Sequence, residues 1–333
     1  MRNALLFCLG GLGDLLAAAP SIQFLRRRFP AAHLSLVCRE EYGGLLRELE
    51  IVNDVLRGDG PRLAPLFSSP CPPDGEAADW IKGFDLIVAW RQGREVDDLE
   101  KNLLSLAGPG KCRFFHYGPG RPEPVSRFFY EQTAAALAPA AHLQPDLSLD
   151  ACARLPVGQT QKAKGLKLID ALNPGKRFVV VHPGSGGKAK LWPLGRFLDT
   201  IQRLGRHGAS GVLVTGEAEA DMDKVLQEQV WPAGWTWLRS PSLDALSGLL
   251  RLSSFYLGND SGITHLAAAC GAEVIALFLE ENVTAWQPLG RVHLLSATSL
   301  GSISVETVWR VVEGRLRLPK KFSDLRQRKK SGV

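Results

Sequence analysis

The sequence has no long apolar run, no closely paired cysteines and almost no net charge outside its last residues. No stretch of about 18 uncharged apolar residues occurs in the 333 residues, so we expect no membrane-spanning helix. The six cysteines form no C-x-x-C pair and the seven histidines form no H-E-x-x-H motif, so we expect no structural zinc site. Cysteines scattered among apolar segments act as small hydrophobes, and this usage predicts a reducing, cytoplasmic compartment.

The formal net charge of +6 comes from the C-terminal end of the chain. Residues 317–333 contain seven Lys or Arg and one Asp, so the rest of the chain is close to neutral. A neutral body argues against broad nucleic-acid binding. The basic tail has two open interpretations: it rests on an anionic membrane surface, or it is a disordered end that keeps the protein soluble.

The chain alternates short apolar runs with longer helical patterns. A length of 333 residues predicts two domains at about 150 residues each. The apolar runs predict strands at 4–9, 33–38, 85–90, 177–182, 211–216, 255–260 and 273–278. Helical patterns follow most of them, at 15–28, 125–138, 194–205, 220–230, 243–253, 262–271 and 305–316. This alternation predicts the α/β class: two Rossmann-like domains, residues 1–150 and 151–316, whose parallel sheets face across a cleft.

The first candidate motif is GGLGD at residues 10–14. The apolar N-terminus imitates a signal peptide, but Asp14 among glycines instead indicates a strand, a turn and a helix start. The turn is not a dinucleotide fingerprint, because Leu16 stands where the last glycine would be. Gly11 and Gly13 let backbone N–H groups approach a ligand. Asp14 is either the cap of the helix or a catalytic acid, and spacing alone favours the cap.

Two further loops follow predicted strands in the second half. HPGSGGKAKLWP at 182–193 combines small residues with Lys188 and Lys190, which suits a phosphate or diphosphate, although a mobile polar loop fits as well. GNDSGITHLAAACG at 258–271 opens a helix whose free N–H groups form a second anion site, although taken alone the motif is better interpreted as a helix N-cap followed by a buried core histidine, His265. Two such loops in one domain favour a nucleotide diphosphate. Glu217 or Glu219, after the strand at 211–216, could accept hydrogen bonds from ribose hydroxyls or could simply begin a helix.

Three segments together resemble glycosyltransferase family 9, the heptosyltransferases of lipopolysaccharide inner-core synthesis. These are GGLGDLLAAAPSIQFLRRRFP at 10–30, VVVHPGSGGKAKLWPLGRF at 179–197, and GNDSGITHLAAACGAEVIALF at 258–278, followed by Trp286 and Pro288. The resemblance implies a GT-B fold with an N-terminal acceptor domain and a C-terminal donor domain. It implies inverting glycosyl transfer, without a cofactor or tightly bound metal, from a nucleotide sugar, ADP-heptose, to a lipopolysaccharide core acceptor.

The resemblance also implies roles for particular residues. Asp14 matches the catalytic aspartate, which acts as the general base. The donor-binding positions are Gly184, Ser185, Lys190, Glu219, Asp260, Ser261, Gly262 and His265. The first donor loop departs from that of some family members: they carry two hydroxyl side chains at this pair of positions, whereas Gly184-Ser185 supplies one. The acceptor is expected to be a lipid-linked, phosphorylated saccharide, and the candidates for its acidic groups are Arg57, Arg62, Arg91, Arg94, Lys111 and Arg113, besides the turn glycines Gly11 and Gly13.

Other functions stay open at this point. A related transferase could use another nucleotide sugar for a different surface polysaccharide, and a nucleotide-sugar-binding protein could share the fold without turnover. An epimerase would need acid and base residues around the donor sugar, and no such set is recognisable. The missing fingerprint at 10–16 argues against an NAD-dependent oxidoreductase.

Overall fold

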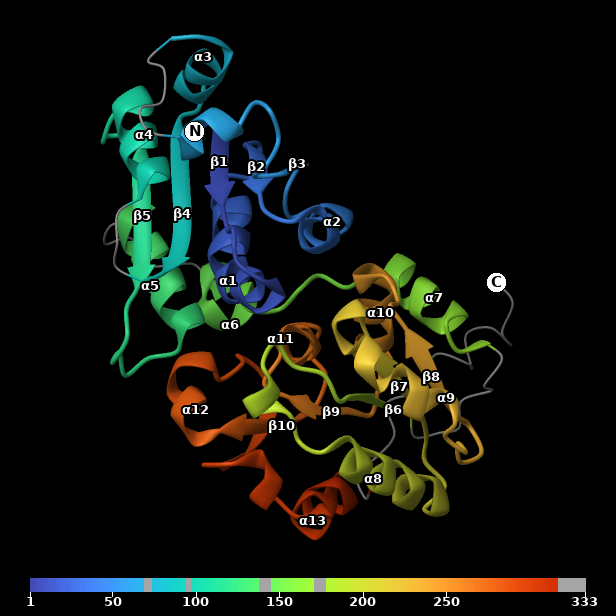
Figure 1. Cartoon of the computed structure of the whole chain (residues 1–333). Coiled ribbons are helices and arrows are strands. Elements are labelled where there is room, and N and C mark those ends of the chain that lie inside the picture. The colour runs from blue at the N-terminus through green and yellow to red at the C-terminus, as the bar shows by residue number, and fades with distance from the viewer. Residues whose placement is uncertain (69–73, 94–96, 138–144, 171–177, 317–333) are drawn as a thin grey trace. The chain divides into compact units, whose positions relative to one another are not determined.

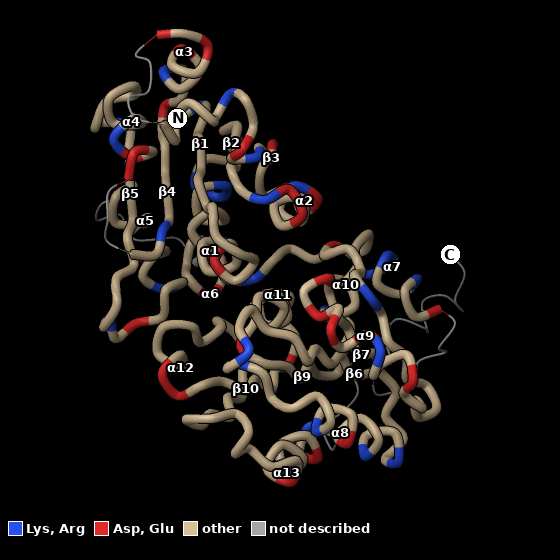
Figure 2. The backbone as a smooth tube through the Cα atoms, viewed as in Figure 1, with Lys and Arg blue, Asp and Glu red and all other residues tan. Residues whose placement is uncertain are grey.

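The computed structural model describes residues 1–68, 74–93, 97–137, 145–170 and 178–316. The chain divides into two compact units, Met1–Ala153 and Arg154–Val333, each built around a parallel sheet (Figure 1). The predicted basic tail, residues 317–333, and Arg94 lie outside the described residues. No described helix is both long enough and apolar enough to cross a bilayer. Both signs of charge are spread over both units (Figure 2).

The first unit contains a five-stranded sheet in the order β3-β2-β1-β4-β5. Its strands are β1 (Asn3–Phe7), β2 (His33–Val37), β3 (Asp54–Leu56), β4 (Leu86–Gln92) and β5 (Cys112–Tyr117). The helices are α1 (Leu12–Arg28), α2 (Glu40–Glu48), α3 (Glu76–Lys82), α4 (Asp98–Ala107), α5 (Val125–Leu137) and α6 (Leu149–Cys152).

Both faces of this first sheet are buried. Leu5 and Phe7 of β1 belong to a core that includes residues of α3 and α4. Ala4 and Leu6 alternate with them and therefore point to the other face, where they are equally buried. A parallel sheet covered on both faces explains why β1 reads in the sequence as one continuous apolar run.

The second unit contains a six-stranded sheet in the order β11-β10-β9-β6-β7-β8. The strands are β6 (Phe178–His182), β7 (Ser210–Thr215), β8 (Trp235–Arg239), β9 (Phe255–Asn259), β10 (Val274–Leu279) and β11 (Val292–Ala297). The helices are α7 (Gln159–Lys167), α8 (Leu194–Arg206), α9 (Asp223–Gln227), α10 (Leu243–Leu252), α11 (Gly262–Ala269), α12 (Glu280–Trp286) and α13 (Val305–Leu316).

The amphipathic pattern of the last described helix explains how α13 packs. Val308, Trp309 and Val312 recur at helical spacing and lie in one core with Phe197 of α8 and Val181 of β6. Full burial of such a side chain contributes about 1.5–3 kcal/mol. The predicted stripe on this helix is therefore a packing surface within the second unit.

The seven predicted strands are confirmed as β1, β2, β4, β6, β7, β9 and β10. The four strands that sequence reasoning missed, β3, β5, β8 and β11, are the edge strands of the two sheets. Edge strands are partly exposed and mix polar with apolar residues, so they lack a continuous apolar run. The helix predicted at 220–230 is shorter: it is a 3-10 turn, η5 (Glu217–Met222), followed by α9.

The described cysteines are buried, as their apolar neighbours in the sequence predict. Burial raises the pKa of the Cys38 thiol to about 12 and that of Cys152 to about 11. Both thiols are therefore protonated at neutral pH, where they act as small apolar packing groups.

Candidate active site

The sequence motifs lie where the strand order of each sheet reverses. In the first unit β1 lies between β2 and β4, and in the second β6 lies between β7 and β9. Ligands of open α/β sheets bind beyond the carboxyl ends of the strands at such a reversal. The turn carrying Asp14 follows β1, and the loops carrying Ser185 and Asp260 follow β6 and β9. Each unit therefore places its predicted site residues at the point where this fold binds ligands.

Asp14 is held at the start of α1. Gly11 is the N-cap of the helix and Asp14 is the third helical residue, so the interpretation of Asp14 as the N-cap is wrong by three positions. The Asp14 carboxylate nevertheless caps the helix, because its Oδ2 accepts the Gly11 N–H at 2.8 Å. Gly13 lies in the first turn of α1, and Gln92, the last residue of β4, donates its side-chain amide to Asp14 Oδ1.

The backbone beside Asp14 leaves no room for a side chain. A Cβ atom on Gly10 would lie 2.4 Å from the Asp14 carboxyl carbon. The glycine in this turn therefore allows the carboxylate to pack directly on the main chain. With the Gly11 N–H on one oxygen and Gln92 on the other, both carboxylate oxygens are oriented.

Three of the described arginines predicted for the acceptor side, Arg57, Arg62 and Arg91, are paired with carboxylates. Arg57 binds Asp59 through two hydrogen bonds, Nε–Oδ1 at 3.0 Å and Nη2–Oδ2 at 2.7 Å, and these lower the pKa of Asp59. Arg62 pairs with Glu76 at 2.9 Å. A ligand with acidic groups would have to compete with these internal partners.

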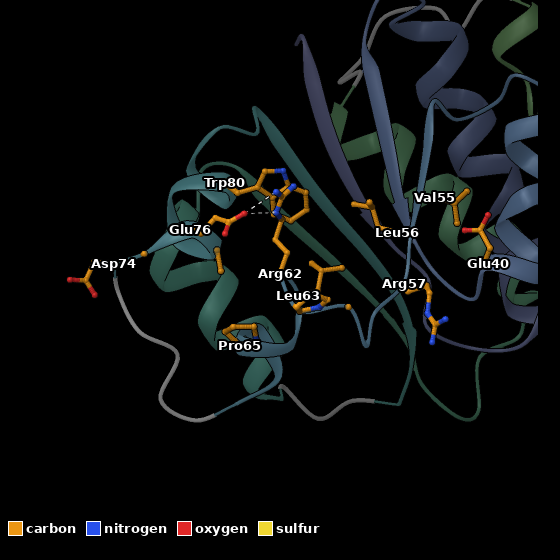
Figure 3. A pocket seen from close by; sticks show the side chains of 14 residues that line it. Glu40, Val55, Leu56, Arg57, Arg62, Leu63, Pro65, Asp74, Glu76 and Trp80 are labelled. Atoms are coloured by element: carbon orange, nitrogen blue, oxygen red, sulfur yellow. Dashed lines mark hydrogen bonds and ion pairs between the residues drawn. The ribbon is translucent and has the colours of Figure 1, made fainter.

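Arg57 and Arg62 line one cavity of about 710 Å³ in the first unit (Figure 3). Arg62 lies over the ring of Trp80, with its guanidinium carbon 5.5 Å from the ring centre. The cavity also contains acidic residues, so its lining is not positively charged overall: Glu40, Asp74 and Glu76. Its apolar wall includes Val55, Leu56, Leu63 and Pro65.

Arg91 does not line this cavity. It lies on β4 and contacts Asp97 at 2.5 Å and the buried Glu100 at 3.5 Å. Glu100 also binds His116 Nε2 at 2.9 Å. Arg91 therefore belongs to an ion-pair cluster between β4, β5 and α4. The remaining candidates, Lys111 and Arg113, donate to main-chain carbonyl groups near β5.

In the second unit, two predicted donor residues, Ser185 and Lys190, contact a third, Asp260. The Ser185 hydroxyl donates to the Asp260 carbonyl oxygen at 2.6 Å, and the Lys190 ammonium pairs with Asp260 Oδ2 at 2.8 Å. Asn282 of α12 donates to the same Oδ2 at 3.0 Å. Asp260 is buried, so Lys190 and Asn282 satisfy a carboxylate that burial would otherwise destabilise.

Asn259, the last residue of β9, connects the loop after β9 to the loop after β6. Its amide donates to the Pro183 carbonyl at 2.7 Å, and its Oδ1 accepts the Trp192 N–H at 3.1 Å. Both ends of the loop that carries Ser185 and Lys190 are thereby fixed to the end of β9. The loop is anchored at the points where it leaves β6 and approaches α8.

The start of α11 presents the predicted D-S-G-x-x-H residues. Ser261 is the N-cap and accepts the Thr264 N–H at 3.3 Å, and Gly262 is the first residue of the helix. His265 lies one turn into the helix, is buried, and makes an edge contact with Trp286, with ring centres 6.1 Å apart. The helix N-terminus favours negative charge at this edge of the sheet.

Glu219 is packed tightly against the first donor loop. A Cβ atom on Gly184 would lie 2.1 Å from Glu219 Oε1, and the Gly216 N–H donates to Oε2 at 2.7 Å. Burial by itself raises the pKa of this carboxyl group, but the nearby His182 ring, whose Nε2 lies 3.8 Å from Oε2, and the Gly216 N–H together outweigh burial, so the pKa of Glu219 is lowered. Of the two acids considered, Glu219 is therefore the buried, oriented one.

A comparison with protein families decides which family these residues belong to. The sequence model of glycosyltransferase family 9 (heptosyltransferase) matches residues 119–302, more than half of the chain. The chain belongs to glycosyltransferase family 9. The match in this family-9 glycosyltransferase includes every predicted donor residue and ends before the described C-terminus.

One curated relative and two solved structures extend this comparison. The family-9 chain is 25% identical over 123 residues to lipopolysaccharide heptosyltransferase 3 of Escherichia coli, a stretch covering 36% of each protein. It thus matches only about a third of that relative's length. A family 9 glycosyl transferase from Veillonella parvula superposes with a TM-score of 0.74 and 16% identity, covering 95% of this chain and 97% of that one.

The second solved structure is the ADP-heptose lipopolysaccharide heptosyltransferase II of E. coli. It superposes with a TM-score of 0.70 and 18% identity, covering 95% of this chain and 98% of that one. At these identities the likeness concerns the fold. It confirms the predicted α/β class and the GT-B architecture of two Rossmann-like domains.

Sequence reasoning missed four polar residues that contact the predicted site residues or their loops: Gln92 in the first unit, and His182, Asn259 and Asn282 in the second. His182 and Asn259 lie within the quoted motifs, at 182–193 and 258–271, so a closer reading of those motifs could have found them. Gln92 contacts Asp14 from the end of β4, and Asn282 contacts Asp260 from α12; both residues lie outside the three quoted segments. Within the described residues, no three His, Cys, Asp or Glu side chains are grouped as metal ligands.

Proposed function

We propose that this protein is an inverting glycosyltransferase that moves a heptose from ADP-heptose to a lipopolysaccharide core acceptor without a tightly bound metal. The observation that carries the proposal is the set of Ser185, Lys190 and Asp260 at the β6–β9 reversal, inside the region matched by the family. The relative named ADP-heptose lipopolysaccharide heptosyltransferase II supports the choice of donor.

The donor diphosphate is assigned to the second unit. Lys190 lies at 2.8 Å from Asp260 and is about one-third exposed, so its remaining N–H groups can meet phosphate oxygens. The start of α11, with Ser261 and Gly262, adds backbone N–H groups that favour the same negative charge. Glu219 is assigned to the ribose hydroxyls, whose donors suit an ionised carboxylate.

The chemical step is assigned to Asp14. The Asp14 carboxylate accepts the proton of an acceptor hydroxyl while that oxygen bonds to the anomeric carbon of the heptose. The bond from that carbon to the diphosphate oxygen breaks on the opposite face, so the anomeric configuration inverts and ADP leaves. Lys190 stabilises the charge that develops on the diphosphate. General-base assistance of this kind typically contributes about 10²–10⁴-fold, and stabilisation of the leaving charge is usually the larger effect.

The acceptor is assigned to the first unit, as a lipid-linked saccharide with acidic groups. Gly11 and Gly13 lie beside Asp14, and Arg57 and Arg62 line a cavity of the same unit. The basic tail, with its seven Lys and Arg, would contact the anionic face of the inner membrane, where each basic residue adds about 1 kcal/mol.

The test is a transfer assay with defined donors. Purified protein is incubated with ADP-heptose and a lipopolysaccharide lacking its core heptoses, and the product is followed by mass spectrometry. We expect one heptose per acceptor, one ADP per transfer, and an inverted anomeric configuration by NMR. Faster transfer from a UDP- or GDP-linked sugar would show that ADP-heptose is not the donor. ADP binding without transfer from any donor would indicate a nucleotide-sugar-binding protein instead.

A further inference from the structure

His182 occupies the central position of the second sheet. It is the last residue of β6, the strand that pairs with β9 on one side and β7 on the other. Ser261 follows β9 and Glu219 follows β7, so the sheet topology places His182 between the two. The His182 side chain is 5% exposed. None of the donor roles described above uses it.

The two ring nitrogens of His182 point to two different donor residues. Nδ1 lies 3.4 Å from the Ser261 hydroxyl, and Nε2 lies 3.8 Å from Glu219 Oε2. The Ser261 hydroxyl lies 3.2 Å from the Thr264 hydroxyl, which in turn lies 2.9 Å from the Tyr256 hydroxyl. A buried row of polar groups thus runs from inside the sheet, through His182, to Glu219.

Glu219 depends on this row for its orientation. The Gly216 N–H holds Oε2 at 2.7 Å, and Gly184 lies against Oε1 with no room for a Cβ atom. The polar ring of His182 approaches the same carboxylate from the end of β6. Removing it would leave a buried carboxylate oriented by one backbone group only.

We propose that His182 is a positioning residue that orients Glu219 so that the site recognises the ribose hydroxyls of the donor nucleotide. The inference rests on the proposed donor site. His182 contacts Glu219 and Ser261, whereas Glu219 contacts the ribose. Loss of His182 therefore removes selectivity for the hydroxyls and leaves the diphosphate contacts at Lys190 in place.

The experiment compares two nucleotides by calorimetric titration, ADP and 2′,3′-dideoxy-ADP. Hydrogen bonds to a charged group are worth about tenfold or more in affinity, so wild-type protein is expected to bind ADP about tenfold more tightly. In His182→Phe, ADP binds about tenfold more weakly, and dideoxy-ADP binds as in wild type. General damage to the site would instead weaken both nucleotides equally, and that result would overturn the proposal.

Two smaller substitutions separate the two contacts. A glutamine amide can reach the place of Nε2 and an asparagine amide the place of Nδ1, so His182→Gln is expected to keep most of the preference for ADP and His182→Asn to lose it. His207 is the matched control. It is exposed at the end of α8 and its ring packs on Trp309, and His207→Phe is expected to leave both affinities unchanged.

Failure of the donor site and failure of the positioning role give different results. If wild-type protein binds neither nucleotide, the proposed donor is wrong. The contact between His182 and Glu219 is then tested by urea unfolding of His182→Phe, Glu219→Gln and the double variant. Losses of stability that do not add would support a direct interaction, whereas additive losses would overturn it. Far-UV circular dichroism of each variant verifies that it is folded.

Discussion

Asp14 and Asp260 each lie beyond the carboxyl end of a strand at the reversal of their own sheet, Asp14 after β1 and Asp260 after β9, but they are held in different ways. Asp14 is half-buried and bound by one backbone N–H group and by the exposed side chain of Gln92. Asp260 is buried, and Lys190 and Asn282 both donate to one of its carboxylate oxygens. A proton acceptor must exchange partners during a reaction, while a binding residue benefits from fixed ones. This difference supports the proposed roles, with chemistry in the first unit and donor binding in the second.

The largest expected effect comes from removing the proton acceptor. Asp14→Asn keeps the shape of the side chain but not its basicity, so we expect transfer to fall by about 10²–10⁴-fold. ADP affinity is expected to stay as in wild type, because Asp14 lies in the other unit. Initial rates and calorimetry measure the two quantities. The exposed Asp150 provides the control, Asp150→Asn, and an unchanged rate in Asp14→Asn would contradict the assignment.

A pair of glycines in one loop tests how tightly the donor side is packed. Gly184→Ala places a Cβ atom 2.1 Å from Glu219 Oε1, and we expect a loss of about 1–3 kcal/mol in the free energy of unfolding. ADP binding is expected to weaken as well. A Cβ atom on Gly186 meets nothing within 4 Å, so Gly186→Ala is the control, expected within about 0.5 kcal/mol of wild type. Equal urea midpoints for the two variants would contradict the packing.

Gln92 gives a smaller effect on the side of Asp14. Gln92→Ala removes one of the two groups that orient the Asp14 carboxylate, and we expect kcat to fall about tenfold, the equivalent of one hydrogen bond to a charged group. The affinity for ADP is expected to be unchanged. Gln132 is exposed on α5 and Gln132→Ala serves as the control. A fall in ADP affinity with normal kcat would place Gln92 in binding instead.

The smallest effect is a pH dependence of stability. The folded-state pKa of Glu219 lies below its usual value of about 4.5, so the ionised group stabilises the fold above that pH, and this contribution is lost as the pH falls through the folded value. We therefore expect the stability difference between wild type and Glu219→Gln to narrow as the pH falls below about 4.5. Urea unfolding at neutral and acidic pH measures it, with the exposed Glu228→Gln as control. A difference that widens in acid would contradict the direction of the shift.

The sequence predicted the interior of both sheets and the loops at their carboxyl ends, because buried parallel strands are continuous apolar runs and the motifs follow them directly. Edge strands such as β3 and β8 were missed, since partial exposure removes that signal. The pairing of Lys190 with Asp260 joins residues 70 positions apart, and it depends on β6 and β9 being neighbours. The partners of Arg57, Arg62 and Arg91 likewise become visible only in the folded chain.

The most direct test is calorimetric titration of ADP into wild type, Asp14→Asn and Lys190→Ala. We expect micromolar binding to wild type and Asp14→Asn, and affinity weaker by at least about tenfold in Lys190→Ala, which loses a charge-assisted contact to the diphosphate. Preference for UDP or GDP would keep the site and change the donor. Undiminished ADP affinity in Lys190→Ala, or loss of affinity in Asp14→Asn, would contradict the division between a catalytic first unit and a donor-binding second unit.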